Sequence, residues 1–188
     1  MLVGAAHYED GLCTAEELSV DAALDIHRQD AGFVWLSFVD PGAEELHALA
    51  GALGLHELAC EDILSAHECP KFESYDDGMY LIVLRTARDE ADERRARFGE
   101  LAVFLGDSFV VTARKRGPHA QGSARATLLA RSDLLACGIS AVLWAILSKV
   151  VADIRPVVAA LDRDLVELEA QVFCDDDTDP TRQIFDLR

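Results

Sequence analysis

The strongest constraint on the fold is a long stretch of regularly spaced apolar residues between Ile139 and Phe173. Large apolar side chains recur there at steps of three or four residues, which is the period of one face of an α-helix. They are Leu143, Leu147, Val150, Ile154, Val157, Leu161, Leu165, Leu168 and Val172. Pro156 lies inside the stretch and is expected to kink the helix or mark a break. The pattern predicts one helix that is too long for the compact part of the chain.

The preceding residues alternate between strand and helix patterns. Short aromatic and β-branched runs predict strands over 33–39, 71–75, 79–86, 101–105 and 109–113. Helices are predicted over 14–29, 40–53, 56–64 and 119–132, with Thr14 and Asp40 as N-caps of the first two. Gly54 is expected to end the second helix, and Asp89–Arg97 has the composition of a polar insert.

Together these elements predict an α/β or α+β fold with a helical arm. We expect residues 1–135 to form the α/β domain and residues 136–188 to form the arm. A further short helix is predicted to begin at Asp179-Pro180.

Charge and motifs exclude several classes of function. The chain has 34 acidic and 17 basic residues, a net charge of −17 at pH 7. A surface with this much negative charge repels the phosphate backbone of nucleic acids. We therefore expect no nucleic-acid partner. No GxSxG, HExxH, P-loop or GxGxxG sequence occurs, and the chain is therefore not expected to be an enzyme.

Cysteine usage and hydropathy indicate a soluble chain from a reducing compartment. The five cysteines are odd in number, scattered, and form no CxxC pair. The longest uncharged run, Leu134–Ser148, is shorter than the roughly 20 residues that span a bilayer. His56 and Cys60 are one helical turn apart, with His67 and Cys69 just beyond, so a zinc site is one interpretation. The more economical one is a buried Cys60 that acts as a small apolar side chain.

Several segments, in order, resemble the CorA family of magnesium and cobalt channels. They include Trp35–Pro41 with Glu44, Glu45 and Leu46, then Gly54–His56, Glu61–Leu64, Pro70–Glu73, Tyr80–Arg85, Phe104–Thr112, and the long helix through Phe173. The resemblance covers roughly residues 30–188. The family's Gly-Met-Asn signature does not occur in these residues, and the resemblance places it beyond residue 188.

The resemblance implies a mixed sheet sandwiched between helices and followed by the start of a long helical stalk. It also implies the regulatory cytoplasmic domain of a pentameric channel, attached to the inner membrane through C-terminal helices. In such channels magnesium binds carboxylates between neighbouring domains and holds the pore closed. One carboxylate comes from the loop after the strand that matches Tyr80–Arg85, so Asp89, Glu90 and Asp92 are the candidate ligands. Mg²⁺ is the expected, weakly bound ion, with Co²⁺ or Zn²⁺ as other candidates. An ordinary solvated loop, partly paired with Arg88, Arg94 and Arg95, is the alternative for these residues.

Two other functions remain open from the sequence. One is a zinc-transporting or zinc-sensing relative, because that superfamily includes zinc transporters. The other is an acidic domain that binds a partner protein through its helical arm. In either case the apolar residues after Pro156 need a surface to cover them, because exposing them to water is costly. We expect the helix begun at Pro180, or self-association through residues 157–187, to provide that surface, unless this part of the chain is mobile.

Overall fold

The computed structural model describes residues 1–29, 32–65, 69–75, 78–90, 95–115 and 121–173. Within these residues, seven strands form one sheet, in the order β2-β1-β3-β7-β6-β5-β4. The strands are β1 (Leu2–Glu9), β2 (Leu12–Ala15), β3 (Phe33–Val39), β4 (Lys71–Ser74), β5 (Tyr80–Glu90), β6 (Arg95–Leu105) and β7 (Phe109–Lys115). The β3–β7 pair is parallel and the other neighbouring pairs are antiparallel. The mixed sheet predicted from the sequence is confirmed.

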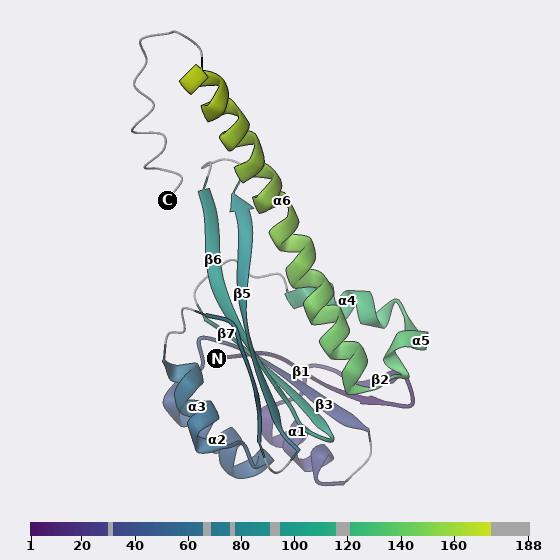
Figure 1. Cartoon of the computed structure of the whole chain (residues 1–188). Helices are drawn as coiled ribbons and strands as arrows, with labels where there is room; N and C mark the ends of the chain where they lie inside the picture. The colour runs from purple at the N-terminus through teal and green to yellow at the C-terminus, as the bar shows by residue number, and fades with distance from the viewer. Residues whose placement is uncertain (30–31, 66–68, 76–77, 91–94, 116–120, 174–188) are drawn as a thin grey trace.

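Helices cover both faces of this sheet (Figure 1). One face packs against α1 (Val20–His27), α2 (Ala43–Leu53) and α3 (Glu57–Leu64). The other packs against α4 (Gln121–Leu129), α5 (Ser132–Leu135) and the long α6 (Ile139–Phe173). β3 lies between the two layers, and its alternate residues enter two separate cores. This burial on both sides explains why its sequence, FVWLSFV, is a nearly continuous apolar run.

The N-terminal prediction was wrong in part. Residues 2–15 form the β1–β2 hairpin, and the predicted helix over 14–29 is shortened to α1. Thr14 belongs to β2, where its hydroxyl lies 2.5 Å from Nδ1 of His7. Glu17 has a φ of 54°, a left-handed conformation that a helix cannot contain. The N-cap is instead Ser19, whose hydroxyl accepts a hydrogen bond from the Ala22 amide at 3.2 Å.

The boundaries of two further predicted helices differ in the structure. Asp40 is not the N-cap of α2, because its N–H donates to the Arg114 carbonyl at 2.8 Å and extends the β3–β7 pairing. Gly42 takes that place, and the Glu45 carboxylate accepts from its N–H at 3.0 Å. Gly54 ends α2 in a left-handed conformation, as predicted. The single helix predicted over 119–132 is two helices, α4 and α5.

The long helix is confirmed from Ile139 to Phe173 and is continuous through Pro156. Pro156 is exposed, and because it has no N–H it cannot donate the helical hydrogen bond to the carbonyl of Ala152. The helix predicted at Asp179-Pro180 lies outside the described residues. No helix in the described part of the chain is long and apolar enough to cross a membrane.

Candidate functional site

Two of the three residues predicted to bind metal, Asp89 and Glu90, belong to the β5–β6 hairpin. Asp89 and Glu90 are the last two residues of β5, paired in the backbone register with Ala96 and Arg95 of β6. Asp92 and the side chains of Asp89 and Glu90 lie outside the described residues. The described residues of the polar insert, 89–90 and 95–97, are therefore strand, because main-chain pairing in a two-stranded ribbon tolerates polar side chains on both faces.

Because Asp89 and Glu90 are consecutive strand residues, their backbone positions limit whether both could bind the same metal ion. Consecutive positions of a strand belong to opposite faces. Positions 89 and 90 thus fall on opposite faces of the hairpin. Loop residues could have converged on one ion, but neighbouring strand positions are not arranged to do so. Each face of the hairpin offers one of the two carboxylate-bearing positions.

The hairpin extends beyond the rest of the sheet, and α6 packs along β5 (Figure 1). Within α6, Val157 and Leu168 are buried, although both lie beyond the part of the helix that covers the sheet core. Of the apolar residues after Pro156 that were expected to need a covering surface, Val157 and Leu168 are buried, whereas Leu161 and Leu165 are 41% and 52% exposed. Asp162, Glu167 and Glu169 are exposed on α6, so an acidic helix accompanies the hairpin.

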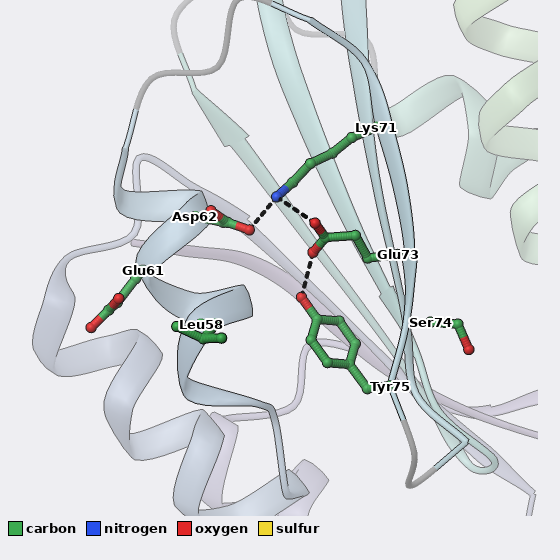
Figure 2. A pocket seen from close by; sticks show the side chains of 7 residues that line it. All are labelled: Leu58, Glu61, Asp62, Lys71, Glu73, Ser74 and Tyr75. Atoms are coloured by element: carbon green, nitrogen blue, oxygen red, sulfur yellow. Dashed lines mark hydrogen bonds and ion pairs between the residues drawn. The ribbon is translucent and has the colours of Figure 1, made fainter.

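A second polar cluster lies between α3 and the edge strand β4 (Figure 2). It borders a surface cavity of about 450 Å³ lined by Leu58, Glu61, Asp62, Lys71, Glu73, Ser74 and Tyr75. Lys71 and Glu73 occupy alternate strand positions and so share one side of β4. The Lys71 ammonium forms ion pairs with Asp62 of α3 and with Glu73, the latter at 3.2 Å. Glu61 points away from this group in Figure 2.

Tyr75 completes the cluster. Its hydroxyl donates a hydrogen bond to Oε2 of Glu73 at 2.6 Å, and its ring stacks on His56 with the centroids 4.7 Å apart. Burial, the Glu73 hydrogen bond and the nearby negative charges all raise the pKa of Tyr75. Burial lowers the pKa of Lys71, but hydrogen bonds to Asp62 and Glu73 outweigh that effect and the net shift is upward. The cluster therefore keeps both its ammonium and its phenol protonated.

This arrangement links α3 to the sheet edge and does not form a divalent-cation site. Lys71 occupies the space between the two carboxylates, where a metal ion would have to bind. No group of three or more His, Cys, Asp or Glu side chains that could hold a metal occurs among the described residues. Sequence reasoning noted Lys71 and Glu73 but not their contact with Asp62. The alternation of Lys71 and Glu73 along β4 was the only sequence signal.

The residues suggested for zinc are mostly engaged elsewhere. The Nδ1 atom of His56 accepts from the Leu58 amide at 3.3 Å and so caps α3. Cys60 is 2% exposed, and burial, followed by the charge of Glu57, raises the pKa of its thiol. A raised pKa disfavours the thiolate that zinc requires. His67 lies outside the described residues, and Cys69 is exposed.

Comparison with known proteins agrees with this geometry. The profile of the CorA-like Mg2+ transporter protein family matches residues 30–188. The cobalt/magnesium transport protein CorA of Methanocaldococcus jannaschii is 24% identical over 172 residues, covering 90% of this chain and 53% of that protein. The chain spans about half the length of the curated relatives it matches.

Two solved structures share the fold. Full-length CmaX superposes with a TM-score of 0.72 at 18% identity, covering 99% of this chain and 56% of CmaX. The ZntB cytoplasmic domain from Vibrio parahaemolyticus RIMD 2210633 gives 0.62 at 12% identity, covering 89% of this chain and 64% of that one. At these identities the likeness concerns the fold alone.

Proposed function

The chain belongs to the CorA-like Mg2+ transporter family, and on this premise we propose that it is the regulatory domain of a divalent-cation transporter. Mg²⁺ is the proposed signal, and Co²⁺ is the second ion for which we expect binding. The ion would bind weakly through the carboxylates at the far end of the β5–β6 hairpin, with Asp89 and Glu90 as the principal ligands and Asp92 as the third candidate.

The observation that supports this proposal is the position of the hairpin. It extends beyond the sheet beside α6 and carries its acidic residues away from the two packed cores (Figure 1). We propose that a hydrated ion and a neighbouring chain can both reach this end of the hairpin. In contrast, the carboxylates of the α3–β4 cluster already neutralise Lys71.

The chemistry of Mg²⁺ fits a site that one chain completes only in part. Mg²⁺ prefers six oxygen ligands in octahedral geometry and retains several water molecules, so one or two carboxylates are sufficient. Positions 89 and 90 belong to opposite faces of a strand, so each face provides one carboxylate. A second carboxylate would then come from another chain. Binding of Mg²⁺ would hold two domains together, and its loss would release them.

The whole protein would place this domain at the cytoplasmic face of a membrane. We propose that sequence beyond residue 188 supplies the membrane helices and that the assembled channel is a homopentamer. Reading the gene downstream tests the first part. Two apolar stretches of about 20 residues with Gly-Met-Asn between them would support it, and a stop codon after residue 188 would contradict it.

Titration calorimetry tests the metal proposal directly. The 188-residue chain is titrated with MgCl₂ and CoCl₂ at constant ionic strength, because a net charge of −17 also attracts cations without a site. We expect weak, saturable binding that the Asp89→Asn and Glu90→Gln variants reduce. Glu9→Gln is the matched control, because Glu9 is exposed and β1 is separated from β5 by three strands. Equal heats from all four proteins would refute the site.

A zinc-related function is the second candidate, favoured by the likeness to the ZntB domain. Because Cys60 is buried and His56 caps α3, we expect no tight, stoichiometric zinc binding through this pair. Submicromolar zinc binding that disappears in Cys60→Ala would replace the magnesium proposal with the zinc one.

A further inference from the structure

The strand β4 forms one end of the sheet and has an open main-chain edge. It pairs with β5 on one side, and no strand in the described part of the chain pairs with its other side. The Tyr75 amide donates to the Met79 carbonyl at 2.9 Å, and hydrogen-bonded pairs alternate along an antiparallel ladder. The residues two and four positions before Tyr75 therefore bond to β5. The N–H and C=O groups of Phe72 and Ser74 point instead to the open edge.

The cavity of about 450 Å³ beside α3 reaches this edge. Ser74 lines the cavity, although its side chain points away from the other lining groups in Figure 2. The main chain of β4 at Ser74 therefore borders the cavity. From the side of α3 the cavity is lined by Leu58, which is 60% exposed, and by Asp62. Because side chains alternate along a strand, a strand added beside β4 would place every second side chain at the cavity.

The cavity side of the edge attracts positive charge. Three carboxylates line it, those of Glu61, Asp62 and Glu73, against the single ammonium of Lys71, which leaves two negative charges in excess. Lys71 forms ion pairs with Asp62 and Glu73, but a carboxylate has about four lone-pair sites and accepts from more than one donor. A lysine or arginine side chain from an added strand fits this side, and an acidic one is repelled.

The opposite side of the edge is apolar. Phe72 is 64% exposed and stacks on Tyr80, which is 41% exposed, with the ring centroids 5.8 Å apart. An added strand would place its remaining side chains beside Phe72. Aromatic and β-branched side chains make the favourable cross-strand contacts with such a ring. The two sides of the edge thus favour different side chains on one strand.

We propose that the open edge of β4 binds an extended segment of a partner protein in which basic residues alternate with apolar ones. The segment adds a further strand to the sheet, with its main chain bonded to Phe72 and Ser74. Its basic side chains lie at the cavity and its apolar side chains lie beside Phe72. The Lys71–Asp62 ion pair holds β4 against α3 before binding, so the edge needs no ordering when the segment binds. No residue of the proposed magnesium site takes part, so the two proposals succeed or fail separately.

Fluorescence anisotropy with the 188-residue chain at about 0.15 M salt tests this proposal. The probe is a labelled, terminally blocked peptide in which three lysines alternate with three valines, and we expect saturable binding. Two peptides of the same charge control for general attraction to a chain of net charge −17. One has its lysines in a block before its valines. The other has proline in place of each valine and cannot form a complete ladder. Each should bind at least about tenfold more weakly.

Variants of β4 test the contacts from the side of the protein. Ser74→Pro removes the outward N–H and leaves the pairing with β5, because Ser74 does not donate to β5. It should weaken binding about tenfold. Ser74→Ala is the matched control, because it keeps the N–H, and it should bind as the wild type does. Phe72→Ala truncates an exposed ring and should weaken binding about fivefold. Circular dichroism shows whether each variant is folded.

Three outcomes would overturn the proposal. The first is the absence of saturable binding by the alternating peptide. The second is equal binding of the proline peptide, or unchanged binding by a folded Ser74→Pro variant, since the attraction would then be to charge alone. The third is sedimentation in which the chain dimerises and Ser74→Pro makes it monomeric, because the occupant of the edge would then be a second copy. Weaker binding by Ser74→Pro together with normal binding by Ser74→Ala supports the added strand.

Discussion

The two halves of α6 have similar apolar periodicity but different surroundings. Residues 139–150 lie on the sheet, where Val142 and Ile146 belong to a core that also contains Trp35 and Val103. Residues 151–173 extend past that core beside the β5–β6 hairpin, and among residues 151–170, whose burial is described, only Val157 and Leu168 are buried. Apolar periodicity thus predicts that a helix forms. How much each of its residues contributes to the stability of the protein depends on whether that residue packs against the sheet.

The largest expected difference between the halves comes from a truncation in the core. Ile146 is 3% exposed, and Ile146→Ala removes buried methyl groups and leaves a cavity. We expect it to lower the free energy of unfolding by about 2–5 kcal/mol. Val166→Ala, at an exposed position of the second half, should change it by less than about 0.5 kcal/mol. Urea denaturation measures both, and equal losses would show that the halves are packed alike.

An alkaline titration probes Tyr8, which belongs to the core on which the first half of α6 packs. Tyr8 is 1% exposed and stacks on Phe33, and burial raises its pKa from 10.0 to about 12. The folded protein therefore keeps a proton that the unfolded chain releases above about pH 10. The free energy of unfolding should fall between pH 10 and 12, by about 2–3 kcal/mol from this group.

The Tyr8→Phe variant isolates this contribution, because Tyr75 also has a raised pKa and remains in both proteins. Denaturation of both proteins across this pH range should show a steeper loss of stability in the wild type. Parallel curves would mean that the Tyr8 hydroxyl ionises as freely in the folded protein as in the unfolded one.

The smallest effect is expected where the two halves meet. Lys149 and Asp153 form an ion pair one helical turn apart, with both side chains partly exposed. Lys149→Met keeps the aliphatic stem and removes the charge. It should cost no more than about 0.5 kcal/mol, and less at high salt because the charges are screened. A loss of several kcal/mol in thermal denaturation would mean that this junction is a major anchor of the helix.

Much of the fold followed from periodicity and turn residues. The strand FVWLSFV, the β6–β7 hairpin around Gly106-Asp107-Ser108 and the bounds of α6 were predicted from local pattern alone. The β1–β2 hairpin was missed because Thr14, Glu16 and Glu17 resemble the start of a helix. Glu17 has a left-handed φ, and the amide of the next residue, Leu18, donates to the Ala5 carbonyl, a long-range contact that no local window contains.

The candidate site was predictable only in its residue types. Acidic residues after Tyr80–Arg85 were identified, but their composition favoured a loop, whereas the backbone continues as paired strands to Glu90. The contact of Lys71 with Asp62 joins an edge strand to a helix, and the sequence carries no signal for such a contact. Residue patterns therefore suggested which carboxylates bind metal, and tertiary contacts show that two others, Asp62 and Glu73, are paired with Lys71.

The central claim is that the end of the β5–β6 hairpin, and not the α3–β4 cluster, responds to Mg²⁺. Backbone amide NMR spectra of the 188-residue chain, recorded during a MgCl₂ titration at constant ionic strength, test this most directly. The account predicts saturable shifts centred on positions 88–96, with little change at Asp62, Lys71 and Glu73. Shifts centred on those three residues, or small unsaturable shifts spread over the acidic surface, would contradict it.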